Sequence, residues 1–121
     1  MDDAFTEIEL QYYIQKLKKE RSEYTLIALA IILKEIKVFV PIVTNSSNEN
    51  FCCFTKFNKV WLICFSSKDC NTSKYRLKKI NFVDLINECL GIKNVSGVVI
   101  NPLSDVDIYL ENKVLKFILD Q

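Results

Sequence analysis

The run Val60-Trp61-Leu62-Ile63-Cys64-Phe65 constrains the fold of this chain more than any other segment. An unbroken apolar run with β-branched and aromatic residues is typical of a buried strand. Such a strand is apolar on both faces, so other elements have to pack against each side of its sheet. The rest of the chain is therefore expected to supply neighbouring strands and covering helices.

Two helical segments precede this strand. Residues 4–20 carry apolar side chains at helical spacing with Glu and Lys between them, and residues 24–33 continue an apolar face. Ser22 lies between the segments as a cap or a kink. We therefore predict two helices with a break near Arg21, and one long bent helix is the alternative.

Residues 37–59 are predicted to form two strands, a loop between them and a turn after the second. The segment Lys37–Val43 is β-branched, and its Pro41 favours an edge strand or a strand end. Thr44–Asn50 is polar and is predicted to be a loop. Phe51–Phe57 is predicted to be a second strand, with Asn58-Lys59 as the hairpin turn that follows it.

The second half of the chain alternates strands and helices. The predicted elements are a short polar helix or turn at 67–70, a strand at 75–80, a helix from 81 or 82 to Gly91, a buried strand at 97–102, a strand at 106–110 and a helix at 111–119. This order indicates one α+β domain over residues 1–121, with a mixed sheet of about five strands. Residues 1–21 are expected to form an added N-terminal helix, and two helices follow later in the chain.

The composition excludes several kinds of chemistry. The chain has no His, which removes Ser-His-Asp triads, Cys-His pairs and His-based zinc sites. It has 2 Gly, so no phosphate-binding glycine loop can be formed. A net charge of +1 gives no long-range attraction to nucleic acid or acidic lipid. We expect no enzyme activity, no cofactor and no metal, and neither nucleic acid nor membrane as a partner.

The N-terminus and the thiols indicate a cytoplasmic protein. Met1-Asp2-Asp3-Ala4 lacks the basic, apolar start of a signal peptide, and the apolar run Leu26–Leu33 is too short to span a bilayer. The 5 cysteines include no C-x-x-C pair. Reduced thiols in an intracellular core are therefore favoured over a disulfide framework or a zinc site.

Three clusters of reactive or charged side chains each have a structural alternative. Asp105 and Asp107 follow a strand and fit a hard-cation site, but capping of a turn is favoured over it. Adjacent Cys52 and Cys53 face opposite sides of a strand, and structural thiols are favoured over a reactive one. The third cluster fits either RNA contact or a charged edge strand that discourages aggregation. It comprises Lys74, Arg76, Lys78 and Lys79, which alternate with Tyr75 and Leu77.

Several segments resemble the SseB family (enhanced serine sensitivity protein, N-terminal domain). Gly97–Pro102, a strand of small residues that ends in Asn-Pro, is the most specific match. The other matching segments are the helix and strand from Leu26 to Ile42, the aromatic-rich strand Val60–Phe65, the polar helix start Ser66–Asp69 and the helix Phe82–Ile86.

The resemblance covers residues 24–119 and departs from the family in two places. Residues 1–20 have no counterpart, and Phe65-Ser66 stands where the family has a Phe-Thr pair. The resemblance implies a small intracellular bacterial domain with no established catalytic residue. Under it, Asn101 and Pro102 are structural residues of the turn.

A protein-binding module of unspecified role is the leading functional hypothesis. The alternative is an immunity protein that binds and neutralises a cognate bacterial toxin. Loops on a rigid sheet are where binding residues tend to lie. The predicted partner surface is the Thr44–Asn50 loop with the acids Glu49, Asp69 and Asp105, which would suit a basic protein partner.

The helix at residues 4–20 is a second candidate for a partner surface. Its Tyr12 and Tyr13 cannot both face one core. The alternative is a helix that simply packs against the sheet.

Overall fold

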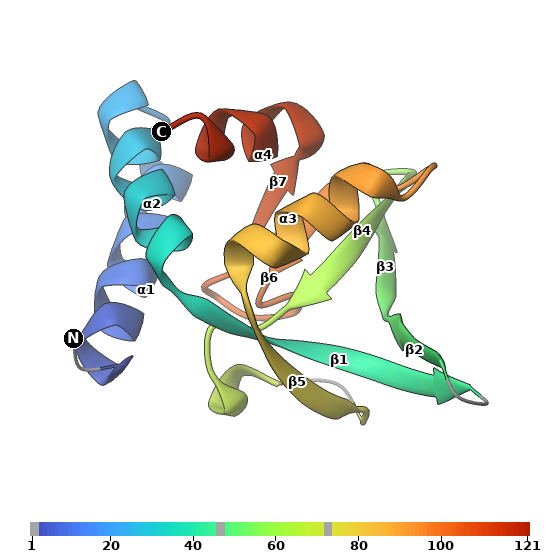
Figure 1. Cartoon of the computed structure of the whole chain (residues 1–121). Coiled ribbons are helices and arrows are strands. Elements are labelled where there is room, and N and C mark those ends of the chain that lie inside the picture. Colours follow the sequence, from blue (N-terminus) through green and yellow to red (C-terminus); the bar gives the residue numbers. More distant parts are fainter. Residues whose placement is uncertain (1–2, 46–47, 72–73) are drawn as a thin grey trace.

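The computed structural model describes residues 3–45, 48–71 and 74–121 (Figure 1). The described elements follow one another as α1 (Asp3–Lys19), α2 (Glu23–Glu35), β1 (Lys37–Asn45), β2 (Asn48–Phe51), β3 (Cys53–Lys56), β4 (Lys59–Cys64), the 3₁₀ helix η1 (Lys68–Cys70), β5 (Arg76–Asn81), α3 (Phe82–Gly91), β6 (Gly97–Ile100), β7 (Ile108–Glu111) and α4 (Asn112–Leu119). The predicted α+β class is confirmed.

The strands form two sheets rather than one mixed sheet of about five strands. One sheet has the order β2-β1-β5, and the other has the order β3-β4-β6-β7. β4 and β6 are parallel, and every other pairing is antiparallel. An isolated antiparallel bridge between Phe39 and Phe65 also connects the two sheets.

Pro41 explains why the sheet divides, and its predicted place at an edge or a strand end is wrong. β1 is the central strand of its sheet, with β5 on one side and β2 on the other. The carbonyl of Pro41 accepts from Cys52 N at 3.2 Å, so the ring nitrogen, which carries no hydrogen, faces the same side. Without a donor there, the carbonyl of Cys52 accepts instead from Ile63 of β4 at 3.3 Å. The strand that begins as β2 thereby passes to the other sheet as β3.

Strand β4 is covered on both faces, as its sequence predicts. Alternate residues of β4 enter two different cores. Leu62 and Cys64 lie in the larger core, which α1, α2, α3 and α4 complete. Trp61 and Ile63 lie in a smaller core with Phe65 and Val99.

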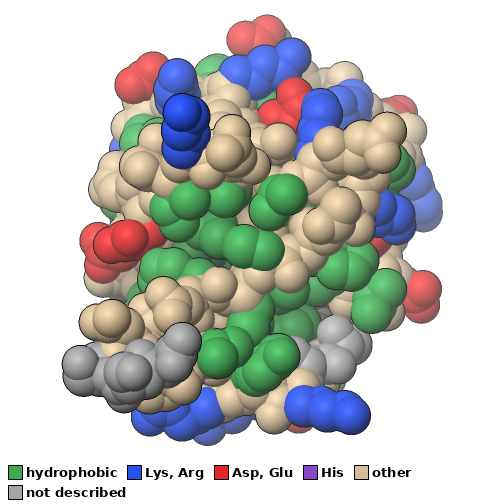
Figure 2. All heavy atoms as spheres, turned by 90° about the vertical axis from the view of Figure 1, so that its right-hand side faces the viewer, with side chains coloured by type: hydrophobic (Ala, Val, Ile, Leu, Met, Phe, Trp, Pro, Cys, Tyr) green, Lys and Arg blue, Asp and Glu red, His purple; other side chains and the backbone are tan. Residues whose placement is uncertain are grey.

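The smaller core is bordered by aromatic side chains and lysines, one of which, Lys68, belongs to η1. The ammonium of Lys56 lies 5.5 Å from the ring centre of Tyr109, and the ammoniums of Lys68 and Lys79 lie 5.8 and 5.6 Å from that of Phe39. Figure 2 shows hydrophobic side chains gathered on the right-hand side of Figure 1, where β2 and β3 lie.

The predicted break between the first two helices is confirmed. Ser22 is the N-cap of α2, and its hydroxyl accepts from Thr25 N at 3.1 Å. α1 packs against α2, with Leu10, Ile14 and Leu17 in the larger core. Tyr12 is 57% exposed and Tyr13 is half-buried, as expected for adjacent residues that cannot share one core.

Two predicted boundaries differ from the structure. Thr44 pairs with Glu49 and Asn45 with Asn48, so the described part of the predicted 44–50 loop continues β1 and β2; residues 46 and 47 lie outside the described residues. The hairpin turn is Phe57-Asn58, one residue earlier than predicted, and both residues have φ of 59°. Polar strands that pair mainly through their backbones leave no hydrophobic pattern in the sequence. This is why the hairpin between β1 and β2 was not predicted.

Candidate functional site

The loop between β6 and β7 is held from inside by a buried asparagine. Asn101 is fully buried and has φ of 55°, a left-handed conformation that asparagine tolerates better than most residues. Its Oδ1 accepts from Ser66 N at 2.9 Å, and its Nδ2 donates to Ser66 Oγ at 3.0 Å and to Val106 O at 3.4 Å. These bonds join the carboxyl ends of the parallel strands β4 and β6. The turn role expected for Asn101 is confirmed.

Ser104 closes the loop upon itself. Its hydroxyl donates to the carbonyl of Asn101 at 2.7 Å and accepts from Val106 N at 3.2 Å. The turn-capping role that the sequence favoured for Asp105 or Asp107 therefore belongs to Ser104. A serine shortly after the Asn101-Pro102 turn was the only sequence signal for it.

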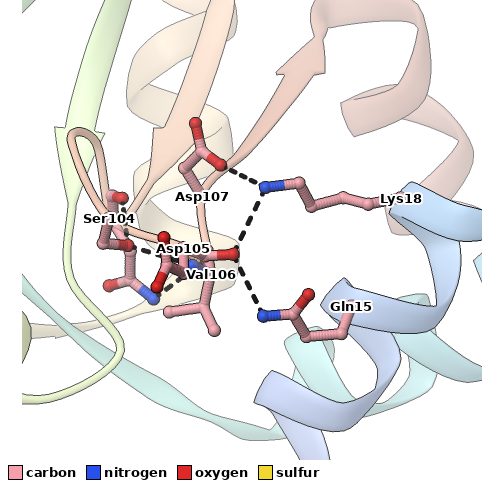
Figure 3. A network of polar contacts seen from close by, with 7 residues as sticks. Gln15, Lys18, Ser104, Asp105, Val106 and Asp107 are labelled. Atoms are coloured by element: carbon pink, nitrogen blue, oxygen red, sulfur yellow. Dashed lines mark hydrogen bonds and ion pairs between the residues drawn. The ribbon is translucent and has the colours of Figure 1, made fainter.

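Two side chains of α1 brace the loop from outside, and Figure 3 shows both pointing toward it. Gln15 Nε2 donates to the carbonyl of Asp105 at 3.0 Å, and Lys18 Nζ donates to the same carbonyl at 3.3 Å. Lys18 also forms an ion pair with the carboxylate of Asp107 at 2.5 Å. The loop is thus tied to a helix almost ninety positions earlier in the chain, which sequence spacing could not reveal.

The braced loop presents one large apolar side chain. Leu103 is 72% exposed and has φ of 64°. A left-handed conformation costs a residue with a side chain roughly 1–2 kcal/mol. Asp105, two residues later, is also exposed. We define residues 101–107 as the β6–β7 loop and treat it as the candidate site.

The structure places the three predicted partner-binding acids on separate elements. Glu49 lies on strand β2, and its carboxylate accepts from Arg76 at 2.8 Å and from Lys78 at 3.1 Å. Asp69 lies in η1, and Asp105 lies in the β6–β7 loop. In Figure 1 the β1–β2 hairpin extends to the right, away from η1 and from the β6–β7 loop. Glu49 is therefore not a neighbour of Asp105, and its charge is matched within the chain.

The basic cluster lies on a strand at the edge of its sheet. β5 pairs with β1 and, within the described ranges, with no other strand. Arg76 and Lys78 contact Glu49, and Lys79 lies near the ring of Phe39. This placement fits the expected charged edge strand.

The described thiols have their pKa values raised. Burial raises the pKa of Cys89 to about 11 and raises that of fully buried Cys64 as well. Burial also raises the pKa values of Cys52 and Cys53. Cys52 packs on the smaller core and Cys53 is exposed, so the two do face opposite sides. A raised pKa lowers the thiolate fraction, which is the nucleophilic form.

The described residues contain no group of three or more His, Cys, Asp or Glu side chains that could hold a metal ion. Within the same ranges, no helix is both long and apolar enough to cross a membrane.

Comparisons with known proteins return no match to a family model, to a curated protein or to a solved structure. The resemblance to the SseB family therefore stays a prediction.

Proposed function

We propose that this chain is a protein-binding module that presents the β6–β7 loop to a protein partner. The exposure of Leu103 is the observation that carries the proposal. The exposure of a large apolar side chain and its left-handed conformation both cost stability, and such costs are commonly kept where a position serves a function. Protein–protein contact is such a purpose, because the partner would cover the side chain.

The loop is organised before any partner arrives. Asn101 and Ser104 bind it from inside, and Gln15 and Lys18 bind it from outside. A loop that is already ordered loses little conformational entropy on binding, so more of the contact energy appears as affinity.

The proposed role is non-catalytic. The polar side chains of Asn101, Ser104 and Asp107 are engaged in contacts that shape the loop. They support recognition rather than proton transfer, because a general acid or base has to be available to a substrate. The resemblance to the SseB family implies no catalytic residue either.

An immunity protein is a narrower form of the same proposal. The side chain of Asp105 is exposed, whereas the carboxylates of Asp107 and Glu49 are paired with Lys and Arg. An exposed acid beside an apolar anchor would suit a basic partner such as a toxin nuclease. Protection of cells that express the captured partner would support this form, and toxicity unchanged by co-expression would reject it.

Affinity capture from the source cells tests the proposal. Leu103→Ser removes the apolar anchor and should lower the recovery of a stoichiometric partner by about tenfold. Ile8→Ser is the matched control, because Ile8 is 67% exposed on α1 and lies outside the loop. Both variants should keep the wild-type unfolding midpoint.

Equal recovery by Leu103→Ser and wild type would reject the loop as the binding surface. Loss of the partner by Ile8→Ser alone would instead support the surface of the first helix. Absence of any stoichiometric partner would contradict the binding role itself.

A further inference from the structure

The outer edge of β7 offers backbone hydrogen-bonding groups that could form a second binding site. β7 is the last strand of the β3-β4-β6-β7 sheet and, in the part of the chain that is described, pairs only with β6. Asn112 N donates to Ser96 O at 2.9 Å, which sets the alternation of this antiparallel ladder. The backbone N–H and C=O groups of Ile108 and Leu110 therefore face β6, and the backbone N–H groups of Tyr109 and Glu111 face outward.

An apolar cleft of about 220 Å³ adjoins this edge. Its apolar lining includes Leu17 of α1, Leu26 of α2, and Val114 and Phe117 of α4. Arg21 and Ser22 of the turn between α1 and α2, Glu23 at the start of α2, and Tyr109 and Leu110 of β7 also line it. The cleft thus combines a strand edge with room for an apolar side chain.

We propose that β7 accepts an extended peptide segment of a partner protein as an additional strand, with one apolar side chain of the peptide in the cleft. This site is separate from the β6–β7 loop and does not depend on it. An extended peptide offers donors and acceptors at the spacing of the β7 edge, and its alternate side chains point into the cleft.

The lining of the cleft favours a single peptide over a second copy of this chain. The turn between α1 and α2 borders the same cleft as β7 and α4, so helices of this chain lie beside the edge. A β7 strand from another copy would arrive together with its own helices, which would have to fit beside these. A single extended segment needs only the width of one strand.

Cations surround the end of β7 and favour an acidic peptide. The hydrogen bond from Lys59 to Glu111, at 2.8 Å, is the largest cause that lowers the pKa of this carboxyl, and Lys113 and Arg21 lower it further. These three cations outnumber the two carboxylates nearby, Glu111 itself and Glu23 of the cleft, by one charge. An acidic side chain of the peptide would complement it.

Removal of one backbone donor tests the proposal. Glu111 has φ of −67°, which proline adopts without strain, so Glu111→Pro removes the outward N–H and keeps the backbone. Glu111→Ala is the matched control, since it loses the same carboxylate and retains the N–H. The probe is a short linear peptide selected on phage against the purified chain, with its Kd measured by fluorescence anisotropy.

The expected result is a Kd about tenfold weaker for Glu111→Pro than for Glu111→Ala. N-methylation along the peptide should weaken binding at every second residue, and this readout does not depend on the folding of a variant. Equal Kd values for the two variants would overturn the proposal, as would uniform tolerance of N-methylation or a failed selection. A wild-type dimer that Glu111→Pro dissociates would overturn it in favour of a second copy.

Discussion

At the scale of single residues, Asn101 combines two properties that few side chains share. Its backbone is left-handed, and its buried side-chain amide both accepts a hydrogen bond from Ser66 N and donates one to Ser66 Oγ. Leu103 has a comparable φ without any such polar contact among the described bonds, so its conformation depends on the surrounding loop. Stability at 101 and recognition at 103 are therefore expected to separate by mutation.

Replacement of two left-handed asparagines, Asn101 and Asn94, by glycine tests the role of the Asn101 amide. Asn101→Gly keeps the backbone conformation but leaves Ser66 N without its acceptor, so the free energy of unfolding should fall by about 2 kcal/mol. Asn94→Gly is the control, because Asn94 has φ of 71° but is exposed, and its change should stay within about 0.5 kcal/mol. Urea denaturation measures both, and equal losses would show that the backbone conformation alone matters.

At the scale of secondary-structure elements, close contact between β6 and β7 depends on Gly97. A Cβ at this position would lie 2.0 Å from the carbonyl oxygen of Leu110 and 2.9 Å from Glu111 Cα. Both atoms belong to the backbone, so β7 would have to move. Movement of β7 would also alter the cleft beside its outer edge.

The two glycines of the chain provide a matched pair of variants. Gly97→Ala should lower the free energy of unfolding by about 3 kcal/mol through overpacking. Gly91→Ala meets nothing within 4 Å at the end of α3 and should raise it by about 0.5 kcal/mol. Thermal unfolding of the two variants checks both signs, and a neutral Gly97→Ala would contradict the close approach of the strands.

Most elements could be predicted from the sequence because their hydrophobic periods are clear. The two-sided run of β4, the break at Ser22, the helix that ends at Gly91 and the strand before Asn101 have strong local signals. The hairpin around Glu49 and the passage of the chain between sheets at Pro41 could not be predicted. They depend on backbone pairing between strands, which leaves little trace in residue type.

The candidate site was predicted only in part for the same reason. Asp105 belongs to the loop and Asn101 shapes it, and both were identified from turn chemistry. The bracing by Gln15 and Lys18 spans distant segments, and Leu103 is exposed within the loop that they brace. No local pattern distinguishes an exposed leucine in a turn from one that packs inward.

At the scale of the whole molecule, buried thiols link stability to alkaline pH. Cys89 has a pKa of about 11 in the fold, and burial raises that of Cys64 as well. An unfolded thiol ionises near pH 8.5, so above that pH the native state binds more protons than the unfolded state does. Their contribution to stability is complete below about pH 8.5 and is lost as pH rises toward the folded value.

Urea unfolding at a series of pH values checks this linkage. The free energy of unfolding should fall from about pH 8.5 upward, and Cys89→Val should fall less steeply because it lacks one of these groups. Lysines and tyrosines titrate in both proteins, so the difference between the two slopes isolates the thiol. Identical slopes would show that ionisation of Cys89 is not coupled to unfolding.

Site-specific photo-crosslinking in the source cells tests the central claim, that the β6–β7 loop contacts a protein partner, most directly. A photoreactive amino acid replaces Leu103 in one protein and Ile8 in another, since both positions are largely exposed. The predicted result is one dominant adduct of defined mass from position 103 and none from position 8. An adduct from position 8 alone, or no adduct from position 103, would contradict the claim.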